Sequence, residues 1–346
     1  MHATHFVKAG IFAAVLTLIG FTSWELYLRN TGISIDYDDT PAMWASKREQ
    51  VYLPKEKSTV FIGSSRIKYD LDIDTWKNIT GDEPIQLAIE GSSPAPVLQD
   101  LADDEKFHGK LVIDVTEILF FSQFPPHLSE PQKNVSYFKD ETPSQRFSAM
   151  ISYAAESELL FLDRWNYCTN AFLDKLEVPS RKGVFVFPVF PLDFGRMTAD
   201  RQAKMTDRFL ADTNLQNKVK QIWKYLGDNN RQPPMSGKPL DEFLLTIKSA
   251  TDKIKARGGE VIFVRTPSSG PFYMGESQGF PRDKYWDRLL TVTQCKGIHF
   301  KDDPATANMQ CPEFSHLSPY DAVTYTKSLI HSLQQNGWKL AKQSTL

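Results

Sequence analysis

The sequence predicts an α/β domain with a mostly parallel sheet, preceded by one N-terminal membrane helix. Three short apolar runs, Thr59 to Ile62, Ile85 to Ile89 and Leu111 to Val115, each end in a polar turn. They follow one another at intervals of about 25 residues, which leaves room for a crossover helix between parallel strands. The carboxyl ends of such strands meet at one edge of the sheet, so functional turns are expected there.

Residues 1–29 predict a signal anchor, that is, an uncleaved transmembrane helix. Ala9 to Trp24 carry no charge and lie between Lys8 and Arg29, with Glu25 as the single acid near the end of the run. No small-x-small cleavage site follows, which favours an anchor over a cleaved signal peptide. With such an anchor we expect the domain to be exported, to the periplasmic or extracellular face.

The rest of the chain divides into a stalk and one domain. Residues 30–57 are polar, contain proline and lack a sustained helical period, so they predict a stalk that drapes onto the domain. Residues 58–340 predict the domain itself, with an irregular and partly helical insertion at about 120–239. Within the insertion, Gly183 to Phe190 could be an edge strand, a buried segment or a hydrophobic lip, and Thr198 to Leu226 predicts a helix.

Regular structure returns after the insertion. Apolar residues from Leu240 to Ile254 keep helical spacing, and Gly258-Gly259 ends that helix before the strand Glu260 to Arg265. Near the end of the chain, Ser318 is a good N-cap and Pro319 suits the first position of a final helix. His316 is therefore expected in a short loop directly before a well-specified helix.

Composition limits the classes of partner and cofactor. The formal charge of -2 gives no electrostatic argument for a nucleic-acid partner. No metal-ligand spacing, P-loop or dinucleotide motif is present, so we expect no metal and no cofactor. In an exported domain Cys295 and Cys311 could form a disulfide that leaves Cys168 unpaired; the alternative is three free thiols.

Two segments 250 residues apart carry the residue types of a serine hydrolase. The strand at Thr59 to Ile62 ends at Gly63-Ser64-Ser65, and a strand that ends at a glycine and presents a hydroxyl is a candidate nucleophile position. On its own this turn is more typical of a surface turn with locally bonded serines. His316, three residues after Glu313, has the spacing for a base whose tautomer is selected by an acid.

These blocks, in order, resemble the SGNH (GDSL-like) hydrolase superfamily. The likeness spans residues 59–333 and depends on Gly63-Ser64-Ser65, Gly91 after the second strand, and Glu313-Phe314-Ser315-His316. It implies a three-layer α/β/α, flavodoxin-like fold, with Ser65 as nucleophile, His316 as base and Glu313 in place of the usual aspartate. The sequence departs from the family at Asp114-Val115-Thr116-Glu117, where the asparagine block that supplies an oxyanion donor is expected.

Without that asparagine, the oxyanion would depend on backbone N–H groups of Ser65 and Gly91, helped by Arg66 or Arg265. Each arginine could instead form a structural ion pair, and the residue types alone do not separate these roles. Loss of one oxyanion donor costs about 3 to 4 kcal/mol of transition-state stabilisation.

The Gly-Ser-Ser turn together with an anchor resembles the membrane-tethered branch of the family, which includes DltD-like and alginate O-acetylation-like proteins. That likeness implies a serine esterase or O-acyltransferase acting on acyl esters of an envelope or extracellular polysaccharide, beside a membrane-bound O-acyltransferase. The alternative, favoured by the missing asparagine, is an inactive polysaccharide-binding or scaffolding subunit. Phe280 and Tyr285-Trp286 could stack against sugar or simply pack a loop onto the domain.

Overall fold

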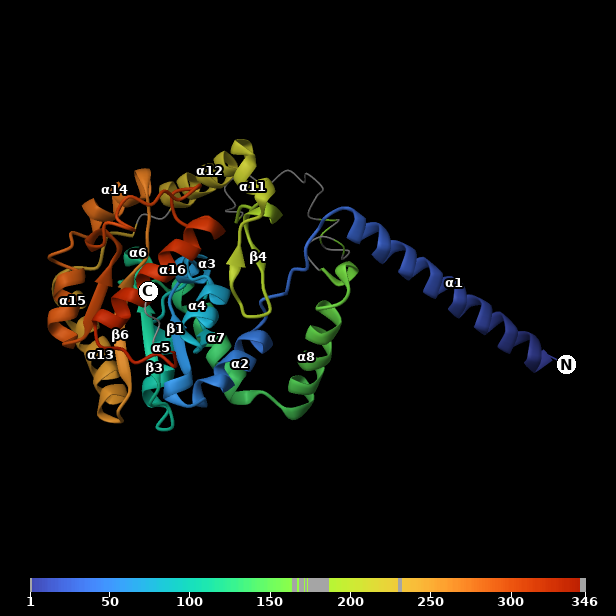
Figure 1. The fold of residues 1–346 in the computed structure, drawn as a ribbon, viewed down its shortest axis with the longest axis horizontal. Coiled ribbons are helices and arrows are strands. Elements are labelled where there is room, and N and C mark those ends of the chain that lie inside the picture. The colour runs from blue at the N-terminus through green and yellow to red at the C-terminus, as the bar shows by residue number, and fades with distance from the viewer. Residues whose placement is uncertain are drawn as a thin grey trace.

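The core of the domain is a five-stranded parallel sheet. The computed structural model describes residues 2–163, 167, 171, 173, 187–229 and 232–342. The strand order is β2-β1-β3-β6-β7, which is the flavodoxin-like order 2-1-3-4-5 when the strands of this sheet are counted along the chain (Figure 1). The strands are β1 (Ser58–Ile62), β2 (Glu83–Gln86), β3 (Lys110–Asp114), β6 (Glu260–Arg265) and β7 (Lys296–His299).

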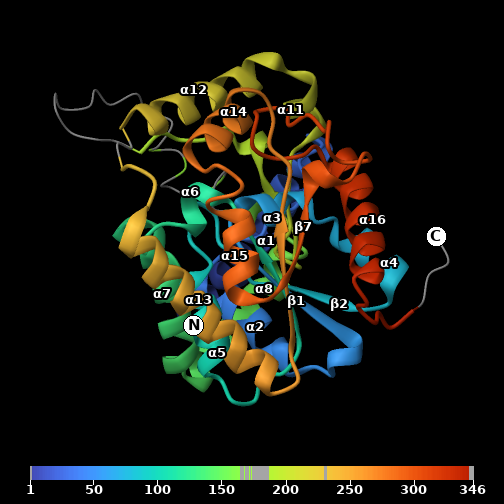
Figure 2. The same cartoon turned by 90° about the vertical axis from the view of Figure 1, so that its left-hand side faces the viewer.

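Helices cover both faces of the sheet, which confirms the predicted α/β architecture. One face packs through residues such as Ile62, Leu111 and Phe263 against four helices: α2 (Pro41–Glu49), α5 (Ala95–Asp103), α13 (Gly237–Ala256) and α15 (Trp286–Thr293). The other face packs through Phe61, Val112 and Ile262 against α3 (Ser65–Asp70), α4 (Ile73–Thr80) and α16 (Pro319–Gln335). Successive strand residues contribute to opposite faces, so buried strands are apolar at nearly every position. Figure 2 shows the two helical layers on either side of the sheet.

Local signals end and begin these helices as expected. Gly81 adopts the left-handed conformation that ends α4, with φ of 68°. Ser318 caps α16 by accepting a hydrogen bond from the backbone N–H of Asp321, and Pro319 is its first residue. The predicted helix and strand around residues 240–265 are both present, as α13 and β6.

The insertion between β3 and β6 differs in part from its prediction. The helix predicted for Thr198 to Leu226 is wrong over its first third, because residues 196–204 form a hairpin of β4 (Arg196–Met197) and β5 (Ala203–Lys204). Helices follow at α11 (Asp207–Ala211) and α12 (Thr213–Asn229). The insertion begins with α6 (Glu117–Phe120), α7 (Pro125–Asp140) and α8 (Pro143–Glu156). Of the apolar segment at Gly183 to Phe190, residues 183–186 lie outside the described residues, and 187–190 form neither helix nor strand.

Residues 30–57 are part of the domain rather than an irregular stalk. They contain α2, whose Trp44 is fully buried in the core and donates its indole N–H to the carbonyl of Leu87 at 3.0 Å. Arg48 of the same helix is buried and bonds to Asp100 at 2.9 Å. Short 3-10 turns at Gln50–Tyr52 and Lys55–Lys57 then lead into β1.

Helix α1 (His2–Asn30) projects away from the domain (Figure 1). Its stretch His5–Asn30 is 26 residues long and contains an 18-residue window with a mean hydropathy of 1.8, so it is long and apolar enough to cross a membrane or to serve as a signal anchor. The two described cysteines, Cys295 and Cys311, are buried free thiols, so the disulfide alternative is wrong; Cys168 lies outside the described residues.

Candidate functional site

Ser65 stands at the carboxyl end of β1, as the first residue of α3. The chain turns there through Gly63, where an added Cβ would come within 2.5 Å of the Asp114 Cβ, so only glycine fits against β3. Ser64 caps α3 and is buried, with its hydroxyl 2.7 Å from that of Thr116. Ser65 is only partly buried. The turn therefore uses Ser64 for structure and leaves Ser65 as the accessible hydroxyl.

His316 and Glu313 reach Ser65 from the loop before α16. The Ser65 Oγ lies 2.8 Å from His316 Nε2, and His316 Nδ1 lies 2.9 Å from Glu313 Oε1. An ionised carboxylate only accepts hydrogen bonds, so in the neutral imidazole Nδ1 carries the proton and Nε2 is free to accept from the Ser65 hydroxyl. These three side chains, predicted from the sequence, thus form a serine-histidine-acid arrangement.

The position of Glu313 is fixed by neutral donors. Its Oε1 also accepts the backbone N–H of His316 at 2.6 Å and that of Ser315 at 3.3 Å. Its other oxygen, Oε2, accepts the indole N–H of Trp223, which comes from α12 in the insertion. Glu313 is fully buried, so every one of these bonds is shielded from water. Its side chain is therefore long enough to reach the imidazole from three residues away.

Aromatic rings from the insertion enclose the His316 imidazole. The rings of Tyr69, Phe194 and Trp223 have centroids 4.5, 5.6 and 6.1 Å from that of His316. Tyr69 lies on α3, whereas Phe194 and Trp223 belong to the insertion. His316 is 1% exposed as a result. The sequence does not predict the role of Trp223, because nothing in the residue pattern connects it with Glu313, 90 positions away.

Arg66 and Arg265, predicted as oxyanion or substrate ligands, belong to a buried ion cluster instead. Both guanidinium groups bond to Glu276 of α14 (Gly270–Gly279), Arg66 to Oε1 and Arg265 to Oε2. Arg265 also bonds to Glu117 at 2.8 Å. Burial opposes ionisation of Glu276, but the two guanidinium groups outweigh it and lower the pKa of that carboxyl to about 2. Both arginines therefore form structural ion pairs, which was the alternative to a role in binding substrate or the oxyanion.

The segment Asp114 to Thr116, where an oxyanion asparagine was expected from the resemblance, forms a hydroxyl network instead. Thr116 donates to Asp114 Oδ2 at 3.0 Å, and its oxygen lies beside that of Ser64. Asp114 in turn accepts from Thr266 at 2.8 Å, and burial raises the pKa of the Asp114 carboxyl. Gly91, the other predicted contributor, lies in an exposed turn after β2 with φ of 61°. The assignment of backbone N–H groups of Ser65 and Gly91 as oxyanion donors stays a prediction.

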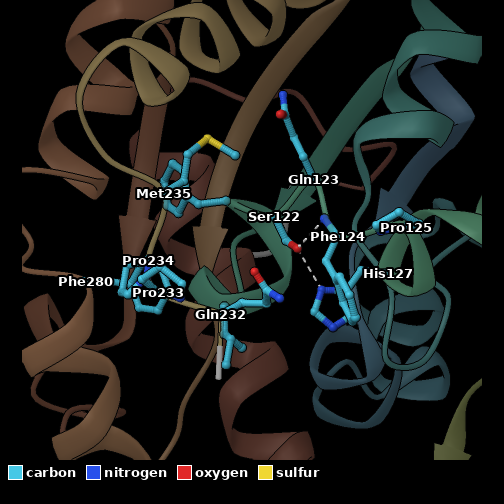
Figure 3. Close-up of a pocket in the computed structure, with 12 residues that line it drawn as sticks. Ser122, Gln123, Phe124, Pro125, His127, Gln232, Pro233, Pro234, Met235 and Phe280 are labelled. Carbon is cyan, nitrogen blue, oxygen red and sulfur yellow. Dashed lines mark hydrogen bonds between the residues drawn. The ribbon is translucent and has the colours of Figure 1, made fainter. Parts of the chain in front are cut away.

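A separate pocket of about 340 Å³ opens at the same edge of the sheet, on the α13 side (Figure 3). It contains a second serine-histidine pair, with Ser122 Oγ 2.8 Å from His127 Nδ1, but within the described residues no carboxylate bonds to His127. Burial lowers the pKa of His127, which favours the neutral ring. Neither Ser65 nor His316 lines this pocket. Its lining is uncharged: Ile118, Phe121, Ser122, Gln123, Phe124, Pro125, His127, Gln232, Pro233, Pro234, Met235 and Phe280.

The predicted sugar-stacking residues divide between packing and this pocket. Tyr285 and Trp286 are buried in the core on the α13 face, where they pack a loop onto the domain. Phe280 lines the pocket. Among the residues that the structure describes, no group of three or more metal-ligating side chains is present.

Comparisons with known proteins identify no relative. No protein-family model matches the chain, and no curated protein sequence matches it significantly. The functional argument therefore depends on the geometry around Ser65.

Proposed function

We propose that this protein is a membrane-anchored serine esterase or O-acyltransferase that works through an acyl-enzyme on Ser65. The observation that carries the proposal is the continuous set of contacts from Ser65 Oγ to His316 Nε2, and from His316 Nδ1 to Glu313. A nucleophile within hydrogen-bond reach of a base that is itself oriented by an acid is the general signature of covalent catalysis by serine.

The proposed first half-reaction forms the acyl-enzyme. Ser65 Oγ attacks the ester carbonyl carbon while its proton moves to His316 Nε2, and Glu313 stabilises the imidazolium that results. The tetrahedral intermediate then collapses: the bond to the alcohol oxygen breaks, and the proton on His316 passes to that leaving oxygen. The acyl group remains as an ester on Ser65.

The second half-reaction regenerates the enzyme. A water molecule or a sugar hydroxyl gives its proton to His316 Nε2 and attacks the acyl carbon, and Ser65 leaves with that proton restored. Water yields a free acid and makes the enzyme an esterase; a sugar hydroxyl yields a new ester and makes it a transferase. Both outcomes use the same three side chains.

The proposed substrate is an acylated envelope or extracellular polysaccharide, reached from the exported face of the membrane. The transmembrane-length helix α1 supports a site next to a membrane. The pocket beside Phe124 and Phe280 is separate from Ser65, but its uncharged, partly aromatic lining offers a second contact for a long neutral glycan rather than for a phosphorylated or carboxylated ligand. A membrane-bound O-acyltransferase is the proposed partner, as a source of acyl groups.

A fluorophosphonate probe tests the nucleophile directly. We expect the full-length protein in detergent to be labelled at Ser65, and Ser65→Ala to lose both the label and about 10^6-fold of any esterase activity. Ser64→Ala is the matched control: it removes the neighbouring hydroxyl and the cap of α3, and should keep the label. Absence of labelling in the wild type, or labelling that persists in Ser65→Ala, would contradict the proposal.

A second candidate is a glycan-binding subunit without catalytic activity. The observation in its favour is the Thr116 hydroxyl, which is engaged with Ser64 and Asp114 where the family presents an oxyanion asparagine. This candidate predicts that acylated glycan binds equally to wild type and to Ser65→Ala, with no turnover by either. Release of acyl groups by the wild type alone would eliminate it.

A further inference from the structure

Helix α8 carries an apolar stripe that the domain does not cover. Phe147, Met150 and Ile151 are 60%, 58% and 53% exposed, and together with Ala154 they follow the i, i+3, i+4, i+7 pattern of one helical face. No residue of α8 is fully buried. Among the described helices outside α1, no other exposes three large apolar side chains. A stripe of this kind on a folded domain indicates a surface that contacts something apolar.

The opposite face of α8 attaches it to the domain. Tyr153 bonds through its hydroxyl to that of Thr40 at 2.7 Å, and Arg146 on the flank pairs with Glu49 at 2.6 Å. A capping box between Thr142 and Gln145 fixes the first turn. These contacts fix the rotation of α8 about its own axis, so the apolar stripe faces away from the domain.

The segment that follows α8 is bonded to the membrane-length helix α1. The Glu25 carboxylate of α1 accepts the backbone N–H groups of Leu160 at 3.1 Å and Phe161 at 3.2 Å. The Phe161 ring also stacks on Phe21 of α1, with centroids 5.4 Å apart. Leu160 is four residues beyond the end of α8. Four residues span at most about 14 Å, so the end of α8 lies within about that distance of the residue that bonds to Glu25.

That level coincides with the expected boundary of the bilayer. Trp24 and Tyr27 stack on each other and are 43% and 59% exposed on α1, and such rings concentrate where hydrocarbon meets headgroups. In Figure 1, α8 runs crosswise to α1, on the side of the domain toward which α1 projects. In Figure 2 the side of the domain away from α1 faces the viewer, and both α1 and α8 lie behind the rest of the domain. A helix crosswise to a membrane-spanning helix lies along the membrane surface.

We infer that α8 is an interfacial membrane helix that lays Phe147, Met150 and Ile151 into the bilayer crossed by α1. The stripe contains no charged residue, whereas the flank and the opposite face carry Arg146 and the polar contacts to the domain. Amphipathic helices that lie in the headgroup region have this division of faces. The domain thus contacts the membrane at two places, α1 and α8, and this fixes its orientation above the lipid.

Quenching by lipid-borne nitroxides tests the contact in the full chain. A fluorophore on Met150→Cys, in a Cys168→Ser background, is compared with one on Leu245→Cys in phosphatidylcholine nanodiscs. Leu245 is the matched control, since it is 59% exposed on α13, on the side of the domain away from α1. We expect several-fold stronger quenching and a blue-shifted emission at position 150, and neither at 245. Both variants should keep the wild-type Tm, because neither side chain is buried.

Two results would overturn the inference. One is equal quenching at positions 150 and 245 in nanodiscs where α1 is inserted. The other is protection of position 150 that occurs only when a second membrane protein is added, which would assign the stripe to a protein partner instead of lipid. A Phe147→Glu substitution adds a further check: it should reduce quenching at position 150 while α1 remains inserted.

Discussion

Two buried glutamates at the same edge of the sheet, Glu313 and Glu276, have opposite surroundings. Glu313 is surrounded by neutral donors: two backbone N–H groups, the Trp223 indole and the His316 ring. Glu276 lies between two permanent cations, Arg66 and Arg265. A carboxylate among neutral donors has its charge available for a cation that forms during a reaction. A carboxylate between two guanidinium groups is already neutralised and serves the fold.

The neighbouring residues Ser65 and Arg66 show the same contrast: one contacts His316, and the other belongs to the ion cluster. One helical turn directs the Ser65 hydroxyl to His316 and the Arg66 guanidinium into the ion cluster, where its Nε donates to the Ser315 hydroxyl at 3.3 Å. Arg66 therefore ties α3 to the loop that carries His316. We interpret the ion cluster as the support that keeps the two halves of the candidate site together.

Between the two glutamates, the larger expected effect on activity is that of Glu313→Gln. The amide keeps the size of the side chain but cannot select the His316 tautomer as a carboxylate does, so kcat/KM should fall by about 10^4-fold. The free energy of unfolding should fall by about 1 to 3 kcal/mol, because the amide oxygen can keep the backbone bonds but the NH2 group then faces the Trp223 indole N–H, another donor. Ester hydrolysis and urea unfolding of the same preparation provide both numbers. Activity within tenfold of wild type would show that Glu313 is not the acid.

Glu276→Gln should instead reduce stability strongly and activity little. Removing this charge leaves two buried guanidinium groups without their shared partner, which costs about 3 to 5 kcal/mol of unfolding free energy. Residual activity per folded molecule should stay within a few-fold of wild type at low temperature. Urea unfolding at neutral pH is the measurement, and a loss below about 1 kcal/mol would remove the distinction between the two glutamates.

Acid titration of stability should sharpen the comparison. The pKa of Glu276 is lowered from 4.5 to about 2 in the folded protein, so between these values the unfolded chain binds more protons than the folded one. This stabilisation is complete above pH 4.5 and is lost as the pH falls toward 2. Glu117 acts in the opposite sense, because burial raises its pKa. The quantity to measure is thus the difference in free energy of unfolding between wild type and Glu276→Gln, which should shrink as the pH falls. A difference that stays constant would refute the lowered pKa of Glu276.

The smallest expected effect is that of Trp223→Phe. It preserves the aromatic cover of His316 but removes the indole donor to Glu313, and loss of one bond to a carboxylate should lower kcat by about tenfold. KM should change little, because no substrate contact is removed. Trp44→Phe is the matched control: it deletes an indole bond to the backbone carbonyl of Leu87, which bonds to none of the three catalytic side chains, so it should reduce stability and leave kcat unchanged. Equal kcat values for the two variants would show that Trp223 only packs.

The sequence was most informative where structure follows local rules. The apolar runs and helix caps predicted the sheet, α13 and α16, since strand burial and capping depend on neighbouring residues. Helix α2 was missed because a short helix with one buried tryptophan has no clear period, and its stability comes from Trp44 in the core. The β4-β5 hairpin was missed because its strands have two residues each.

At the site, the sequence predicted the three side chains of the serine-histidine-acid arrangement but not the bonds that hold them in place. Ser65, Glu313 and His316 stand in short blocks, and the structure brings them together as predicted. Bonds such as Trp223 to Glu313 or Arg66 to Glu276 join residues 90 and 210 positions apart. No pattern within a segment encodes such pairs, so the roles of Arg66 and Arg265 could be decided only in three dimensions.

Under the proposed function, the bonds from Glu25 to Leu160 and Phe161 affect how Ser65 would meet a substrate near the membrane. They tie α1 to the segment after α8, so in a membrane-anchored enzyme Ser65 would stand at a set height above the membrane rather than at the end of a flexible linker. Such an enzyme would react only with esters that lie in a thin layer parallel to the membrane. Turnover in cells would accordingly scale with the number of esters per unit of membrane area, not with their concentration in the surrounding volume.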